Sequence, residues 1–157
     1  ENAAINNANI GRAYMNLKNK RGARVFFRKA LELDPEIDTL KKFKVAGVKL
    51  ALITNGNARI QAKKVQILGL ESLMDHIQIE GEFGLGKPDP EAYFNALKQL
   101  NARPEETWMA GDNLEFDVIA PMKLGIYGIW VDIHRIGLES HNGVTPDLVV
   151  ESISELV

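Results

Sequence analysis

The stretch WMAGDNLEFDVIAPMKLGIYGIWV, residues 108–131, decides the fold of this 157-residue chain. It predicts a strand over residues 107–110, a helix over 114–124 and a second strand over 127–131, because two apolar runs flank a segment with helical spacing. A strand, a helix and a strand at this spacing are typical of parallel strands joined by a crossover helix. We therefore expect an α/β protein rather than an all-helical or all-β one.

The same alternation continues on both sides of this stretch. Residues 48–54 form a continuous apolar run, which is typical of a strand buried on both faces. Further strands are predicted at 76–80 and 148–150, and helices at 36–46, 57–68 and 90–100. The fold class that follows is a Rossmann-like parallel sheet flanked by helices, with Trp108 and Trp130 in its core. Two more helices, at 3–17 and 22–33, precede it as an N-terminal α-hairpin.

The composition of the chain excludes several classes of protein. With 45% hydrophobic and 25% charged residues, it is typical of a globular domain. No apolar run approaches the ~20 residues of a membrane helix, and no signal-peptide pattern is present. The absence of cysteine rules out disulfides and thiolate metal sites and fits a cytoplasmic location. The chain begins at Glu1, which indicates a processed, trimmed or engineered piece.

Two polar clusters follow predicted strands, and ligands bind beyond the carboxyl ends of strands in open parallel sheets. Thr54, Asn55 and Gly56 follow the first strand, and the threonine hydroxyl and the next backbone amides can donate to a phosphate oxygen. An ordinary Asn-Gly turn is the alternative. Lys87 lies in the loop GLGKPDP, residues 84–90, where an ammonium group can stabilise an anion. The alternative for Lys87 is a solvated loop lysine.

The strongest cluster is GDNLEFD, residues 111–117. Asp112 ends an apolar strand and Asp117 lies in the first turn of the helix that follows, so both carboxylates can face one spot. Hard oxygen ligands of this kind suit Mg²⁺. The alternative is structural, with Asp112 or Asn113 capping the helix and Asp117 complementing its dipole.

The order and spacing of the three clusters resemble the haloacid dehalogenase superfamily. LALITNGN, residues 50–57, resembles the second motif of that family. GLGKPDPEAYFNAL, residues 84–97, resembles the third motif, and MAGDNLEFDVIAPMKLGIYGIWVD, residues 109–132, resembles the fourth. The resemblance covers roughly residues 35–157 and is closest to the phosphatase-like branch.

The resemblance implies a Mg²⁺-dependent phosphate-monoester hydrolase that acts on a small phosphorylated molecule. The residues that it implies are Thr54, Asn55, Gly56 and Lys87 for phosphate binding, Lys87 and Asp112 for catalysis, and Asp112 and Asp117 for the metal.

The first motif of the family is absent from this chain. That motif is an apolar strand ending in Asp-x-Asp-x-Thr, whose first aspartate attacks phosphorus, and no such strand precedes Thr54. The stretch DPEID, residues 34–38, follows a predicted helix and contains a proline, so it does not replace the motif. The absence implies a hydrolase that is impaired or inactive, with Mg²⁺ bound weakly or not at all. It also removes a central strand, and we expect the strands that end at Thr54 and next to Asp112 to pair directly.

Residues 4–37 resemble a single tetratricopeptide repeat that ends in KALELDP, residues 29–35. This resemblance implies two domains, a helical hairpin at 1–35 and an incomplete α/β core at 36–157, joined in a recombined or designed chimera. The alternative is a divergent remnant of the family's helical cap. Residues 2–31 contain seven basic and no acidic side chains, which is typical of a solvated basic helical face. Binding of an acidic peptide is the alternative, and binding of nucleic acid ranks below it because no base-reading motif is present. A lone repeat and unpaired strand edges both favour a homo-oligomer.

Two functions therefore stand side by side at the level of the sequence. The first is a phosphatase by descent, weakened in this chain by the missing nucleophile. The second is a non-catalytic interaction or scaffold protein. The sequence places neither of them at a membrane.

Overall fold

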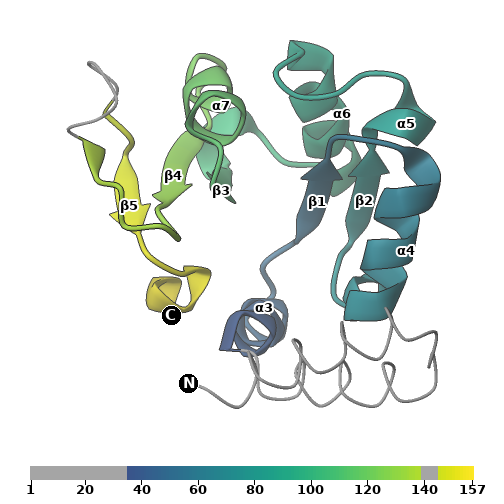
Figure 1. Cartoon of the computed structure of the whole chain (residues 1–157), viewed down its shortest axis with the longest axis horizontal. Coiled ribbons are helices and arrows are strands. Elements are labelled where there is room, and N and C mark those ends of the chain that lie inside the picture. Colours follow the sequence, from purple (N-terminus) through teal and green to yellow (C-terminus); the bar gives the residue numbers. More distant parts are fainter. Residues whose placement is uncertain (1–34, 139–144) are drawn as a thin grey trace.

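The computed structural model describes residues 35–138 and 145–157, so the predicted hairpin at 1–35 lies, apart from Pro35, outside the described residues. The described residues form strands flanked by helices (Figure 1). In chain order the elements are α3 (Pro35–Val45), β1 (Ala51–Thr54), α4 (Ala58–Leu68), η1 (Leu70–Ser72), β2 (His76–Ile79), α5 (Glu80–Phe83), α6 (Pro90–Leu100), η2 (Pro104–Glu106), β3 (Trp108–Gly111), η3 (Leu114–Ile119), α7 (Ala120–Met122), β4 (Tyr127–Val131), β5 (Leu148–Val150) and η5 (Ile153–Leu156). Within these residues no helix has both the length and the apolar character needed to cross a membrane.

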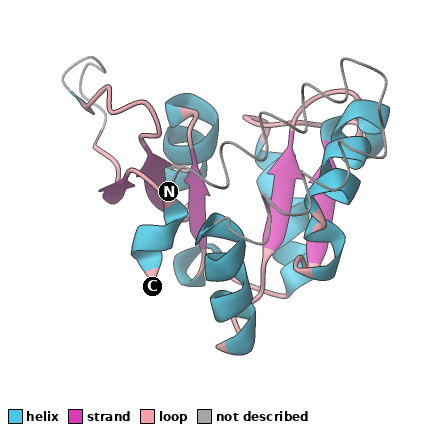
Figure 2. Ribbon diagram, turned by 60° about the horizontal axis from the view of Figure 1, so that its bottom comes forward, coloured by secondary structure: helices cyan, strands magenta, loops and turns pink. Residues whose placement is uncertain are grey.

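The strands form two separate parallel sheets in the described part of the chain (Figure 2). β1 pairs with β2, while β3, β4 and β5 pair in that order. The predicted α/β class, with parallel strands and flanking helices, is confirmed. The prediction that the strand ending at Thr54 pairs directly with the strand ending next to Asp112 is wrong, because β1 and β3 belong to different sheets.

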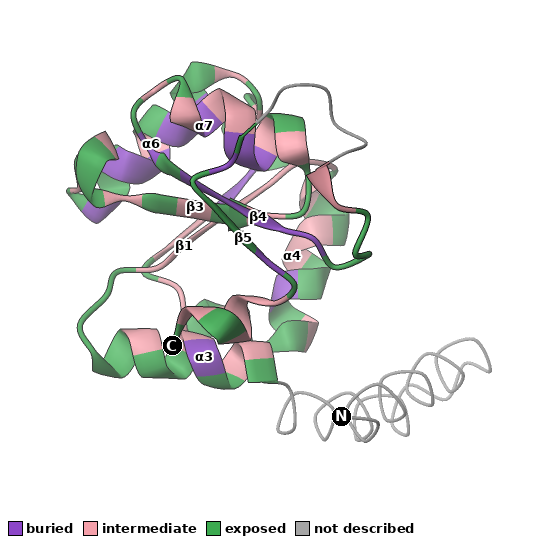
Figure 3. Ribbon diagram, turned by 90° about the vertical axis from the view of Figure 1, so that its left-hand side faces the viewer, coloured by how far each residue is buried: buried purple, intermediate pink, exposed green. Residues whose placement is uncertain are grey.

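Helix α6 explains why the two sheets keep their places without a ladder between them. Its Tyr93 and Leu97 form a buried cluster with Ile126. Ile53 of β1 and Met109 of β3 both pack against this cluster. Packing against a shared helix can hold two strands at a distance that their backbones do not bridge. α6 and α7 lie on one side of the strands and α3 on the other (Figure 3).

The other side of the larger sheet has a smaller core near the chain's C-terminal residues. Ile129 and Val131 of β4 are buried together with Val150 of β5, and η5 packs against them. The hydroxyl of Ser152 donates a hydrogen bond of 3.3 Å to the Glu36 carboxylate, which ties the start of α3 to this region.

Helix ends follow the signals that the sequence carries. The Asn57 side chain accepts a hydrogen bond from the Ile60 amide at the start of α4, and Gly69 ends that helix with φ of 65°. Asp89 caps α6 in the same way, with Pro90 at the first helical position. The predicted helices at 57–68 and 90–100 are therefore confirmed nearly to the residue.

The strands that border the gap between the sheets are less buried than expected. All four residues of β1 are half-buried, where the sequence predicted burial on both faces. Trp108 in β3 is 61% exposed, so its predicted place in the core is wrong, whereas Trp130 in β4 is only 3% exposed, as expected. A strand that has a backbone partner on one side only also lacks the side chains that such a partner would bring.

The predicted helix at 114–124 is interrupted. Residues 114–119 form the π-helical segment η3, and α7 follows with Pro121 inside it. Proline has no amide hydrogen and its ring clashes with the carbonyl four residues earlier, so a regular helix cannot pass through it unchanged. The wider π-helical turn at residues 114–119 accommodates the interruption of the helix before Pro121. Asp117, which lies in this turn, is buried.

Candidate active site

The carboxyl ends of β1, β2 and β3 supply three loops that meet around one buried ion pair. The ammonium of Lys87, in the loop after α5, pairs with the Asp117 carboxylate of η3. The two side chains are only 12% and 6% exposed. Two of the residues that the sequence selected thus lie in direct contact, although 30 positions separate them in the chain.

The second oxygen of the Asp117 carboxylate is also engaged. It accepts a hydrogen bond of 3.1 Å from the backbone amide of Asn113. The Asn113 side chain in turn accepts from the Phe116 amide and caps η3, which is one of the structural roles that the sequence left open. Asp117 therefore holds Lys87 and closes the turn after β3 at the same time.

Asn55 lies beside the same lysine but does not present its side chain to a ligand. Its Nδ2 donates to the Lys87 carbonyl at 2.6 Å, and its Oδ1 accepts from the Lys87 amide at 2.8 Å. Both ends of the carboxamide are therefore occupied by the backbone of one residue. The Asn55 carbonyl accepts a further hydrogen bond of 2.9 Å from the Gln61 side chain of α4.

Gly56, predicted to donate its amide to a phosphate, donates it to the Glu80 carboxylate at 2.7 Å. Its carbonyl accepts from the Gly81 amide at 3.1 Å. A side chain at Gly86 would collide with the Glu80 carboxylate, and one at Gly81 would collide with the backbone of Ala58. The loops after β1 and β2 are thus packed too closely for any residue larger than glycine at Gly81, whereas at Gly86 the Glu80 side chain would have to move.

Thr54 ends β1, opposite Ile79 of β2. It is half-buried, and among the described residues no group hydrogen-bonds its hydroxyl. The Thr54 hydroxyl therefore remains available to a ligand, whereas the Gly56 amide is already engaged by Glu80.

Asp112 lies at the end of β3 and is exposed. Its backbone carbonyl accepts a hydrogen bond of 3.2 Å from the Trp130 indole, so the strand end is fixed while the carboxylate faces solvent. Among the described residues, no group of three or more histidine, aspartate or glutamate side chains could hold a metal ion. Mg²⁺ requires near-octahedral oxygen coordination, and with Asp117 occupied by Lys87 the described residues do not fit it by themselves.

Tyr93 connects the site to the core. Its hydroxyl donates to the Phe116 carbonyl at 2.6 Å, next to the turn that carries Asp117. Burial and the nearby negative charge of Asp117 both raise the pKa of Tyr93, so the phenol stays protonated and remains a donor. Tyr93 is not among the residues selected from the sequence pattern.

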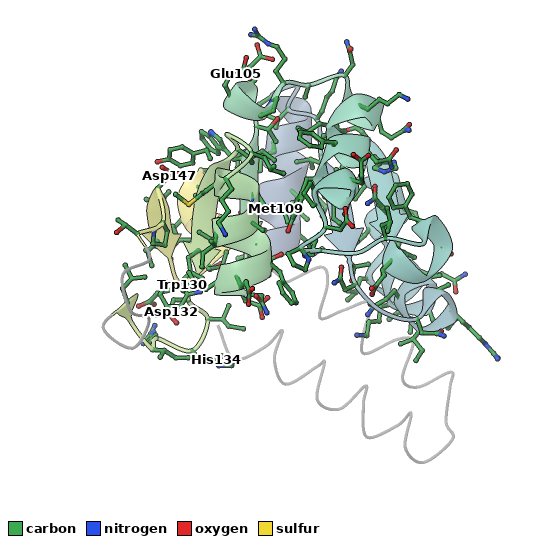
Figure 4. The ribbon with its side chains drawn as sticks, turned by 90° about the horizontal axis from the view of Figure 1, so that it is seen from above. Glu105, Met109, Trp130, Asp132, His134 and Asp147 are labelled. Carbon is green, nitrogen blue, oxygen red and sulfur yellow. The ribbon has the colours of Figure 1, made fainter. Side chains whose placement is uncertain are left out.

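A further carboxylate ends the neighbouring strand β4. Asp132 follows Val131, and Trp130 and His134 lie in the same region of the molecule (Figure 4). Burial raises the pKa of Asp132, but hydrogen bonds from the Gly137 and Ile136 amides and the nearby His134 together hold it below its usual value. These two amides lie 2.8 and 2.9 Å from the carboxylate, so Asp132 closes the loop at residues 132–137 rather than facing the Lys87 loop.

Glu80 is the site residue that sequence reasoning missed, although a signal for it was present. Glu80 follows the apolar strand at 76–79, just as Asp112 follows β3. An acidic residue at the carboxyl end of a parallel strand was the criterion that selected Asp112. The role of Asn55 carried no comparable signal, because a contact between a side chain and a distant backbone leaves no trace in the sequence pattern.

The family of the chain follows from its sequence relatives as well as from this site. A model of the haloacid dehalogenase-like hydrolases matches residues 7–125. The chain belongs to the haloacid dehalogenase-like hydrolases. The match contains Thr54, Lys87, Asp112 and Asp117, on which the resemblance in the sequence was based.

Several curated relatives of this haloacid dehalogenase-like chain are phosphatases. The phosphoserine phosphatase of Thermus thermophilus is 36% identical over 138 residues, which are 85% of this chain and 54% of that protein. The glyceraldehyde 3-phosphate phosphatase of Pyrococcus furiosus is 35% identical over 92 residues, or 59% of this chain and 38% of that protein. The chain therefore spans about half the length, or less, of these relatives.

Solved structures of the same superfamily share the fold. A phosphatase from Thermococcus onnurineus superposes with a TM-score of 0.71 at 23% identity, over 85% of this chain and 61% of that one. The hydrolase YfnB of Bacillus subtilis, solved with bound magnesium, gives the same TM-score at 20% identity, over 88% and 61% of the two chains. At these identities the likeness concerns the fold alone.

Proposed function

We propose that this chain forms most of the core of a phosphate-monoester hydrolase that acts on a small phosphorylated molecule. The observation that carries the proposal is the buried pair of Lys87 and Asp117, which joins the loop after β2 to the turn after β3. A cation held rigidly at the carboxyl edge of a parallel sheet can stabilise a phosphoryl group without reorganising first. The phosphoserine and glyceraldehyde 3-phosphate phosphatases among the relatives support this reaction type.

The residues of the proposed site have distinct roles. Thr54 donates its hydroxyl to a phosphate oxygen, and Lys87 supplies the positive charge. Asp112 is the carboxylate that remains free to face a metal, and Asp117 orients Lys87. For the complete site of such a hydrolase we propose Mg²⁺, although this chain offers it little beyond Asp112 and should bind it weakly or not at all.

The attacking group in this proposal lies outside the described residues. Covalent phosphoryl transfer requires a nucleophile next to the phosphate, and both oxygens of the Asp117 carboxylate are already engaged, by Lys87 and by the Asn113 amide. We propose that the nucleophile belongs to a strand that occupies the space between β1 and β3. This places it between the loops that carry Thr54 and Asp112. The chain alone is therefore impaired or inactive as a hydrolase.

The origin of the segment before α3, residues 1–34, is a separate question. The family match begins at residue 7 and so includes most of the hairpin that resembles a tetratricopeptide repeat. This supports the alternative interpretation of the segment as part of the family's helical cap, and we propose that origin for it.

The proposed function is tested with 4-nitrophenyl phosphate, a generic aryl phosphate, in the presence and absence of Mg²⁺. We expect the chain alone to hydrolyse it at the background rate, and a longer protein that contains a strand ending in Asp-x-Asp-x-Thr to hydrolyse it only with Mg²⁺. In that longer protein Lys87→Met should lower kcat by about 10²–10³, the usual effect of removing one group that stabilises the transition state. Asp112→Asn should have an effect of the same order.

Two outcomes would contradict the proposed function. The first is activity of the longer protein that survives Asp112→Asn and Lys87→Met. The second is no hydrolysis of any phosphate monoester by the longer protein, which would favour a non-catalytic interaction or scaffold protein instead.

A further inference from the structure

We infer that Asn55 is a positioning residue for Lys87. The inference rests on the proposed function only for what the lysine does there. The contact itself is independent of that function, because the Asn55 carboxamide pairs with the Lys87 backbone through both of its polar ends, at 2.6 and 2.8 Å. A carboxamide that donates to a carbonyl and accepts from the amide of the same residue fixes that residue much as a strand neighbour does.

The contact between Asn55 and Lys87 lies between the two sheets, at the carboxyl ends of their strands. β1 and β3 share no backbone hydrogen bonds, so their carboxyl ends are not held together by a ladder. Asn55 extends from the end of β1 to Lys87, and Lys87 extends to Asp117 in the turn after β3. One chain of polar contacts therefore links the two sheets at their carboxyl ends, and Lys87 is its central member.

The side of the contact nearer to β1 is rigid. The Asn55 carbonyl accepts from Gln61, which ties it to the first turn of α4. The next residue, Gly56, donates its amide to Glu80 and accepts from Gly81. The backbone at Asn55 is thus held by hydrogen bonds to its neighbours. The Asn55 carboxamide in turn holds the backbone of Lys87 through two hydrogen bonds.

The contact with Asn55 helps to set the position of the Lys87 ammonium in the site. The position of the Lys87 ammonium depends on its backbone as well as on Asp117, because a lysine side chain is long and flexible. Without Asn55 the Lys87 loop would keep its ion pair but lose the contact that sets where the pair lies. Asn55 therefore acts through Lys87, and its side chain is not a ligand for the phosphate.

The test measures the reactivity of individual amines in the chain as it exists. Acetic anhydride at one fixed pH labels lysines according to their exposure and freedom, and mass spectrometry reads each site separately. We expect Asn55→Ala to raise the labelling rate of Lys87 by about fivefold or more, the factor that corresponds to one ordinary hydrogen bond. Lys64, which is exposed on α4, serves as the internal reference and should not change.

Asn57→Ala is the matched control. Asn57 lies two positions further along the same turn and also accepts a hydrogen bond through its side chain, from Ile60, but it does not contact Lys87. A general loosening of the turn would raise Lys87 labelling in both variants, whereas a positioning role raises it in Asn55→Ala alone. Equal labelling of Lys87 in Asn55→Ala and the wild type, or an equal rise in Asn57→Ala, would overturn the inference.

Asn55→Asp provides a second variant in case Asn55→Ala does not fold. It keeps the acceptor for the Lys87 amide and removes the donor to the Lys87 carbonyl. The ¹H–¹⁵N signal of the Lys87 amide should shift in Asn55→Asp, because a charged carboxylate replaces its acceptor and can no longer donate to the Lys87 carbonyl, and an unchanged signal contradicts the role. Neither readout needs a substrate, so a failure of the proposed phosphatase activity would leave this result intact.

Discussion

Lys87 and Asp117 form an ion pair whose two partners are almost fully buried, and their energetics differ from those of a surface pair. Replacing one partner of a buried pair leaves the other charge without compensation, which costs about 3–5 kcal/mol. We therefore expect Lys87→Met to lower the free energy of unfolding by this amount. The double variant Lys87→Met with Asp117→Leu should recover most of the loss, because two apolar side chains leave no buried charge behind.

Urea denaturation of the single and double variants measures these energies. The exposed pair of Lys42 and Asp38, in α3, is the control, because its side chains are 60% and 61% exposed. Lys42→Ala should cost less than about 0.5 kcal/mol, as is usual for a pair four residues apart on a helix surface. A cost for Lys87→Met as small as that of the control would contradict the buried character of the pair.

At the same scale, the sequence identified positions better than it identified contacts. Lys87, Asp112 and Asp117 were selected because each lies at or beyond the end of a predicted strand, and the structure brings Lys87 and Asp117 into contact. The sequence selected Asn55 for its backbone amide and gave no indication that its side chain binds the Lys87 backbone. Strand order and loop position follow from a sequence pattern, whereas the direction of a side chain within a loop depends on tertiary packing.

At the scale of elements, η3 determines how closely the turn with Asp117 approaches the sheet. It packs over Gly111 of β3 and Gly128 of β4. A methyl group at Gly111 would overlap the Asp117 carboxylate, and one at Gly128 would lie 2.6 Å from Met122. The two glycines therefore allow η3 and α7 to lie directly on the strands.

Gly111→Ala tests this packing. The added methyl group should displace Asp117 from Lys87 and lower the free energy of unfolding by about 1–3 kcal/mol, the usual cost of overpacking. Ala110→Ser is the control, because Ala110 is the preceding residue of the same strand and is exposed, and it should change stability by less than about 0.5 kcal/mol. Thermal or urea unfolding reads both, and an unchanged stability in Gly111→Ala would show that η3 can move away without cost.

The elements also show where sequence patterns fail. Helices with an asparagine or aspartate cap and a glycine end, such as α4, were predicted well because capping is a local interaction. The helix predicted at 114–124 was divided by Pro121, a residue that the apolar spacing alone does not take into account. The direct pairing of β1 and β3 failed for a different reason, since apolar character shows that a strand is buried but not which neighbour covers it.

At the scale of the whole molecule, two half-sheets share one supporting helix and leave two strand edges facing the space between them. β1 and β3 have backbone partners on one side only within the described residues. In these two strands Trp108 is 61% exposed and the residues of β1 are only half-buried. Unpaired edges of parallel strands are unfavourable unless another strand covers them, so this is where a completing segment should bind.

The last prediction follows from this arrangement. A synthetic peptide with an apolar strand that ends in Asp-x-Asp-x-Thr, added in excess to the chain, should slow hydrogen exchange at the amides of β1 and β3 by about tenfold or more. It should also produce Mg²⁺-dependent hydrolysis of 4-nitrophenyl phosphate. A peptide with asparagine in place of its first aspartate separates the two effects, because it should protect both strands and yield no hydrolysis. A peptide with a central proline should do neither, since proline cannot complete a strand ladder. Protection confined to β2, β4 or β5 would mean that the space between β1 and β3 is not where the strand binds, and the proposed place of the nucleophile would then be wrong.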